Sequence, residues 1–117
     1  MLRFWRATIN SRNGLAFAIR SEQAIREELI ALALALPLAW LVGVSMMRRL
    51  ELIAVVVLVL VVELLNTAIE KLADRLTTEQ DPQIGRVKDM GSAAVGVALA
   101  MAGLFWLFAV AERIGFL

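Results

Sequence analysis

The chain has 117 residues, of which 61% are hydrophobic and 20% are charged, and its mean hydropathy is +0.78. It contains no cysteine and no histidine and carries a formal net charge of +1, which excludes disulfides, Cys/His metal sites, an imidazole base and an electrostatic nucleic-acid partner. A single small domain cannot bury this much apolar surface in its own interior, so the composition predicts a small membrane protein.

Residues 1–28 mix basic and aromatic side chains, as in the run Arg3-Phe4-Trp5-Arg6. This mixture is typical of an amphipathic helix that lies at a membrane surface. The pair Asn13-Gly14 predicts a break within the segment. A cleaved signal peptide is not expected, because no apolar region follows the first basic residues.

Three apolar segments follow. Residues 29–47 and 90–111 carry no charge, and at about 1.5 Å per residue each is long enough to cross a bilayer. The segment 50–76 starts apolar and continues through polar residues without proline or glycine, which predicts one long helix. The expected fold is therefore an all-α membrane protein in one domain, residues 1–117, with a surface helix and three transmembrane helices.

The basic residues predict the topology of these helices. Five lie in the N-terminal segment and four in residues 71–88, whereas the opposite side would hold only Arg48, Arg49 and Arg113. Because basic residues favour the cytoplasmic side, we expect a cytoplasmic N-terminus and a periplasmic C-terminus.

The predicted second membrane helix carries a polar stripe, Glu63, Asn66, Glu70 and Asp74. Their spacing places them within an arc of roughly 80° and over about 16 Å of one helix face. A carboxylate at membrane depth is costly and is a functional candidate, and Glu63 suits a general base for an alcohol. The alternative is that these side chains only join helices by hydrogen bonds.

Lys88-Asp89 precede Met90-Gly91-Ser92, where the third apolar segment begins. A helix N-terminus beside a lysine attracts phosphate, although a basic residue there also enforces topology. Carboxylates for magnesium, a lysine for phosphate and a buried base are the parts that phosphoryl transfer requires. Neither a Walker A loop nor a protein-kinase catalytic loop is present.

Two blocks carry a family resemblance. The run from Glu63 to Glu70 with Asp74-Arg75, and the run from Lys88 to Val95, resemble the signatures of the small prokaryotic diacylglycerol kinases. The resemblance implies a homotrimer with active sites shared between subunits, in the bacterial inner membrane. It implies transfer of the γ-phosphate of MgATP to the primary hydroxyl of diacylglycerol, which gives phosphatidic acid during phospholipid recycling.

The same resemblance implies roles for single residues. Glu63 matches the catalytic base, and Asn66 matches a polar position that lines the site. The Mg²⁺ ligands would be Glu22 and Glu70. The other positions expected to contact nucleotide are Arg3, Asp74, Glu79, Lys88 and Asp89. Those expected on the lipid side, with Glu63, are Glu28, Ser92 and Trp106.

This chain departs from the family pattern at Asn10, Asn13 and Gln80-Asp81, where Gram-negative members have tyrosine, a basic residue and a tyrosine-histidine pair. Recognition of adenine and of the lipid headgroup therefore stays open. An undecaprenol kinase of the same family is an alternative, although Met90-Gly91-Ser92 favours the diacylglycerol type. A small proton-coupled transporter, which would need four spans, and a structural subunit, which would tolerate Glu63→Gln, are alternatives from other classes.

Overall fold

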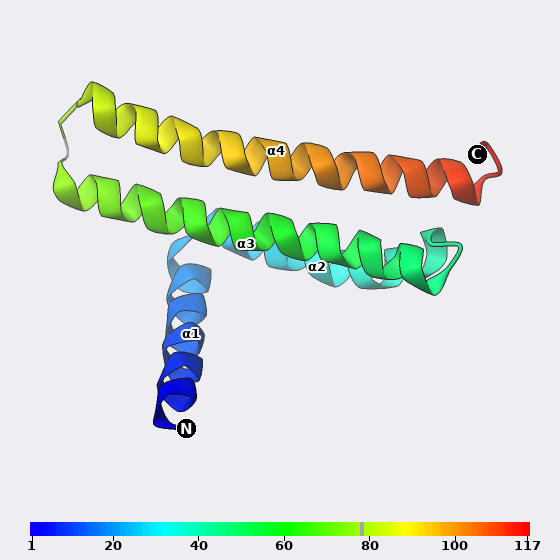
Figure 1. Ribbon diagram of the computed structural model, residues 1–117, viewed down its shortest axis with the longest axis horizontal. Coiled ribbons are helices and arrows are strands. Elements are labelled where there is room, and N and C mark those ends of the chain that lie inside the picture. The colour runs from blue at the N-terminus through cyan, green and yellow to red at the C-terminus, as the bar shows by residue number, and fades with distance from the viewer. Residues whose placement is uncertain (78) are drawn as a thin grey trace.

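The computed structural model describes residues 1–77 and 79–117, and this part of the chain forms four α-helices. They are α1 (Leu2–Ser21), α2 (Gln23–Val42), α3 (Met46–Leu76) and α4 (Pro82–Arg113). Helices α2, α3 and α4 form a bundle, and α1 projects away from it with the N-terminus at its far end (Figure 1). The predicted long helix ending at residue 76 is confirmed.

The boundary between α1 and α2 lies at Glu22, whose backbone is extended, so the segment predicted to run to residue 28 ends as a helix at Ser21 and the next helix begins at Gln23 rather than at residue 29. The Arg26 guanidinium donates hydrogen bonds to the carbonyls of Ile19 and Arg20, at 2.7 and 3.2 Å, and so satisfies the last turn of α1. The predicted break at Asn13-Gly14 is wrong, because α1 continues through both residues.

Helix α2 ends at Val42, before the predicted limit of 47. A side chain on Gly43 would overlap the Ala39 carbonyl and the Arg49 stem, at 2.8 and 2.6 Å, so this tight connection requires glycine. Ser45 is the N-cap of α3, and its side-chain hydroxyl oxygen accepts a hydrogen bond from the backbone N–H of Arg48 at 3.1 Å.

Helix α4 begins at Pro82, eight residues before the start predicted at 90. Asp81 is its N-cap, and one carboxylate oxygen accepts from the backbone N–H groups of Gln83 and Ile84 at 2.8 and 3.2 Å. Proline at the first helical position suits this cap, because it has no N–H to leave unsatisfied. The charged residues that follow are therefore helical.

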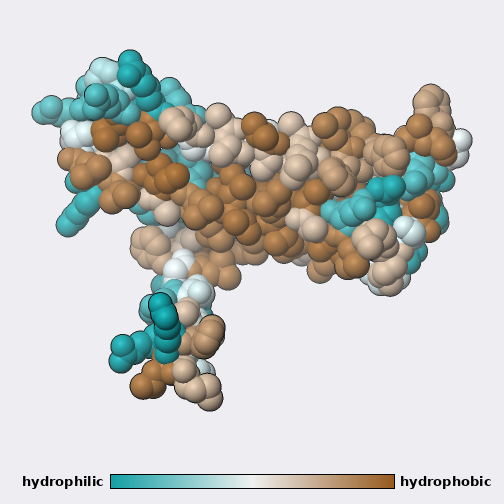
Figure 2. Space-filling model, in the orientation of Figure 1, coloured by the Kyte–Doolittle hydropathy of each residue, from teal (hydrophilic) through white to brown (hydrophobic). Residues whose placement is uncertain are grey.

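The interior is small and rich in alanine. Ala39, Leu52 and Ala109 are fully buried where α2, α3 and α4 meet, and Trp106 packs against them while its Nε1 donates to the Leu52 carbonyl at 3.3 Å. Most large apolar side chains are exposed instead, and they form a belt along the bundle with polar residues at both ends (Figure 2). In the part of the chain that is described, α3 and α4 are long and apolar enough to cross a membrane. A bilayer would cover this belt.

Charged side chains lie at the end of the apolar belt that is far from the α3–α4 loop. Arg48 donates from Nε and Nη2 to the Glu112 carboxylate, at 3.0 and 3.3 Å, and from Nη1 to Glu51. The Arg48 guanidinium also lies 4.7 Å from the centroid of the Phe108 ring. We call Arg48, Glu51 and Glu112 the Arg48 network; it joins the start of α3 to the end of α4.

Candidate active site

The polar stripe predicted on the second membrane helix lies on one uninterrupted helix, α3. Its members differ in exposure: Asn66 is buried, Glu63 and Glu70 are half-buried, and Asp74 is exposed. Asn66 Nδ2 donates to Glu70 Oε1 at 3.1 Å, one turn further along the helix. The stripe therefore runs from the apolar belt towards the polar end of the bundle.

The other end of the Asn66 amide faces α4. A Cβ on Gly91 would overlap Asn66 Oδ1, so the two helices approach closely at this point. Within the described residues, Oδ1 is buried and accepts no hydrogen bond. The orientation of the Asn66 side chain is thus set by Glu70 on one side and by α4 on the other.

Carboxylates from α2 and from the α1–α2 boundary join this stripe. Those of Glu22, Glu28 and Glu70 lie near enough to Glu63 to act on its charge. Burial raises the pKa of Glu28, which precedes the apolar part of α2, and the neighbouring Glu27 raises it further. We call Glu22, Glu28, Glu63 and Glu70 the carboxylate cluster.

Lys71 is the cation bonded to this cluster. Its Nζ lies 2.7 Å from Glu22 Oε1 and 5.2 Å from the centroid of the Phe17 ring on α1. Lys71 therefore joins the surface helix α1 to α3, beside Glu70. Lys71 is a functional residue that the sequence pattern did not predict, although its position next to Glu70 in the chain was a usable signal.

The carboxylate cluster has the ligand atoms that Mg²⁺ prefers, which are carboxylate oxygens. Its four carboxylates also carry more negative charge than Lys71 offsets, and a divalent cation would reduce that excess. Across residues 1–77 and 79–117, no three carboxylates are grouped closely enough to enclose an ion by themselves. Mg²⁺ is commonly held by one or two carboxylates together with phosphate oxygens of a substrate. The cluster suits that arrangement rather than a closed protein site.

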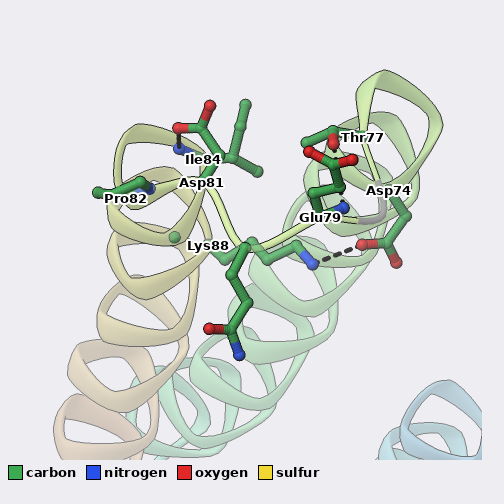
Figure 3. A pocket seen from close by; sticks show the side chains of 9 residues that line it. Asp74, Thr77, Glu79, Asp81, Pro82, Ile84 and Lys88 are labelled. Carbon is green, nitrogen blue, oxygen red and sulfur yellow. Dashed lines mark hydrogen bonds and ion pairs between the residues drawn. The ribbon is translucent and has the colours of Figure 1, made fainter.

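A pocket of about 460 Å³ lies next to the stripe, between the end of α3 and the start of α4 (Figure 3). Lys88 reaches across it from α4 and forms an ion pair with Asp74 of α3, and Glu79 lies on the connecting loop. The pocket combines one cation with several acceptors, as a site for phosphate and hydroxyl groups requires. Its lining residues are Asp74, Thr77, Glu79, Gln80, Asp81, Pro82, Ile84, Gly85 and Lys88.

The expectation that Lys88 stands beside a helix N-terminus is wrong. Helix α4 begins at Pro82, so Lys88 and Asp89 lie almost two turns inside it. The N–H groups at the true N-terminus are occupied by Asp81. Among the residues that line the pocket, the cationic group offered to an anion is therefore the Lys88 ammonium and not the helix N-terminus.

Within the described residues, four expected site residues make no hydrogen bond or ion pair with the carboxylate cluster. Arg3 is in the first turn of α1, the helix that projects from the bundle (Figure 1), and Asp89 and Ser92 are exposed on α4. Trp106 packs against Leu52, roughly 16 Å along α3 from Glu63.

Comparisons with known proteins agree with these features. A model of the prokaryotic diacylglycerol kinase family matches residues 9–110. The diacylglycerol kinase of Escherichia coli is 41% identical over 105 residues, covering 90% of this chain and 86% of its own. That of Pseudomonas aeruginosa is 42% identical over 104 residues, covering 89% and 85%. That of Haemophilus influenzae is 38% identical over 100 residues, covering 86% and 85%.

Proposed function

This chain belongs to the prokaryotic diacylglycerol kinase family, and we propose that it transfers the γ-phosphate of MgATP to the primary hydroxyl of diacylglycerol. The observation that carries the proposal is the Asn66–Glu70 pair on α3. It lies one helical turn from Glu63 on one side and one turn from the Asp74–Lys88 pocket on the other. A half-buried proton acceptor and the proposed phosphate site are thus neighbours on one helix.

In the proposed reaction, a carboxylate oxygen of Glu63 accepts the proton of the lipid hydroxyl as the hydroxyl oxygen bonds to the γ-phosphorus. The bond from that phosphorus to the oxygen bridging the β-phosphate breaks, which gives phosphatidic acid and ADP. The half-buried position of Glu63 supports this role, since α3 is apolar from Ile53 to Val62 and admits a lipid up to the carboxylate. Glu28, close to Glu63, is proposed to contact the same lipid.

Mg²⁺, when bound, would neutralise negative charge that develops on the transferring phosphoryl group. Glu70 and Glu22 are the residues that would hold it, and Asn66 orients Glu70 by its hydrogen bond. Lys71 competes with such an ion for Glu22, so its ion pair would weaken on binding. Lys88, with Asp74 and Glu79, is proposed to bind the phosphates and the nucleoside in the pocket.

We also propose that the site is completed in a homotrimer, with Arg3, Asp89 and Ser92 serving a neighbouring copy. The exposed positions of Arg3, Asp89 and Ser92, and the large exposed apolar surface, support this arrangement. The proposed topology has α2 as the third membrane span, the α3–α4 loop in the cytoplasm and the C-terminus in the periplasm of a bacterial inner membrane. The exposed Phe4 and Trp5 suit α1 to the membrane surface.

The test is phosphate transfer from labelled ATP by purified protein in mixed micelles, with diacylglycerol and undecaprenol offered in parallel. Magnesium-dependent labelling of diacylglycerol is expected, with a loss of at least 100-fold in Glu63→Gln. Glu27→Gln is the matched control, because Glu27 is exposed on α2 and, within the described residues, its carboxylate accepts a hydrogen bond from Gln23 alone. Labelling of undecaprenol alone would show that undecaprenol, and not diacylglycerol, is the lipid substrate. If folded protein labels neither lipid, the proposed kinase activity is refuted.

A further inference from the structure

Gly91 differs from the other glycines of α4. A Cβ on Gly91 would overlap the Asn66 amide, whereas a Cβ on Gly85, Gly96 or Gly103 would meet no atom within 4 Å. Gly91 is also buried, although α4 is exposed over most of its length. Because residue 91 has no side chain, α4 can approach Asn66 of α3 closely at this point.

The missing side chain at residue 91 leaves room for the Asn66 amide, and the Glu70 carboxylate decides which end of the amide faces α4. Its Oδ1 lies against Gly91, so Nδ2 is directed to the opposite side, where it donates to Glu70 Oε1 at 3.1 Å. Rotating the amide by 180° would place Oδ1 against a carboxylate oxygen, and two acceptors repel each other. The rotation would not relieve crowding at residue 91 either, because NH₂ and oxygen are similar in size.

We propose that Gly91 is a positioning residue, which holds the Asn66 amide in the orientation that directs the Glu70 carboxylate towards the metal and phosphate. This inference rests on the proposed kinase function. Gly91 touches neither substrate nor metal and acts through Asn66. An alanine at residue 91 must displace the Asn66 amide or separate α3 from α4. The first change lengthens the bond to Glu70, and the second removes the contact against which Oδ1 rests.

The test compares four proteins: wild type, Gly91→Ala, Asn66→Ala and the double variant. Gly96→Ala is the matched control, because it adds the same methyl group to the same helix in open space. The readouts are Mn²⁺ affinity by electron paramagnetic resonance, in the presence of a non-hydrolysable ATP analogue, and kcat and KM for ATP. Thermal unfolding and size in detergent give the folded fraction to which each value is normalised.

We expect Gly91→Ala to weaken Mn²⁺ binding by roughly 10- to 100-fold, as loss of a residue that orients a metal ligand does. Asn66→Ala should weaken it by a similar factor, and the double variant no further, because both changes remove one interaction. Gly96→Ala should bind Mn²⁺ as the wild type does. A fall in Mn²⁺ affinity of folded protein is a change that a purely packing role for Gly91 does not produce.

Three outcomes would overturn the proposal: wild-type Mn²⁺ affinity in folded Gly91→Ala, wild-type affinity in Asn66→Ala, or additive losses in the double variant. The last would mean that residue 91 acts by another route. Failure of the proposed function is separate, because it appears as absence of lipid labelling by the wild type. The comparison of Mn²⁺ affinities does not depend on that labelling.

Discussion

The ion pair between Lys88 and Asp74 allows a prediction in which stability and activity respond differently. The two side chains are 40% and 61% exposed, so water and salt screen their attraction. Exposed pairs of this kind contribute about 0.2–1 kcal/mol to stability. Lys88 can therefore exchange Asp74 for a phosphate oxygen at little cost to the fold.

Replacing Lys88 by glutamine should then lower the free energy of unfolding by less than about 1 kcal/mol. The same change removes a charge-assisted bond to phosphate, worth about 1.5–3 kcal/mol, which corresponds to a loss of roughly 10- to 150-fold in kcat/KM. The assay is lipid phosphorylation at varied ATP, alongside thermal unfolding in the same detergent. Arg86→Gln, which removes a positive charge from an exposed position of α4, is the control and should leave both quantities nearly unchanged.

Two results would contradict this reasoning. A kcat/KM within threefold of the wild type would show that Lys88 does not contact phosphate in the reaction. A large fall in stability that matches the fall in activity would show that the Asp74 pair is structural and that the pocket collapses without it.

Three further predictions concern regions around the site. Arg48→Gln should lower the thermal unfolding temperature, since it leaves two carboxylates without their shared cation, and KM for ATP should not change. Leu52→Ala should cost about 2–4 kcal/mol in chemical unfolding because Leu52 is fully buried, whereas Leu58→Ala, 37% exposed, should cost clearly less. The pKa of Glu28 is raised above its ordinary value of 4.5, so this carboxyl binds its proton more tightly in the folded state. Its contribution to stability is therefore lost as pH rises from 4.5 through the raised pKa, and Glu28→Gln should flatten thermal stability over that window; an unaltered pH profile would contradict the assignment.

Hydropathy and helical spacing were sufficient to predict α3 and its polar stripe, because both depend on residues close together in the chain. Glu63, Asn66 and Glu70 share a face in any helix without a break. The burial of Asn66 and its bond to Glu70 also follow from local spacing once α4 covers that face. These parts of the site were therefore accessible from the sequence.

The helix ends were harder to predict, because tertiary contacts decide them. Gly14 interrupts nothing, since a glycine costs only about 1 kcal/mol within a helix. The actual break at Glu22 depends on Arg26, which reaches back to the carbonyls of α1. The start of α4 did have a local signal, Asp81-Pro82, but the charged residues after it made the helix appear to begin only where the apolar segment does.

Contacts between helices explain the remaining differences. Lys71 and Glu22 are far apart in sequence and meet only because α1 joins α2 beside α3. The importance of Gly91 cannot be read from its neighbours Met90 and Ser92, since the other glycines of α4 look equivalent in the sequence and differ only in what they face. Single residues at close helix contacts therefore need the structure.

Two regions of the bundle along α3 differ in what their side chains do, one around Leu52 and the other around Asn66. Around Leu52, small side chains from α2 and α4 and the Arg48 network hold the helices together, and the Arg49 guanidinium lies over the Trp40 ring. Around Asn66 the half-buried carboxylates of the carboxylate cluster gather, and their like charges repel one another. The contact at Gly91 lies at the junction, where packing ends and the polar site begins. The stability of the first part allows the second to keep the excess negative charge that the proposed binding of Mg²⁺ requires.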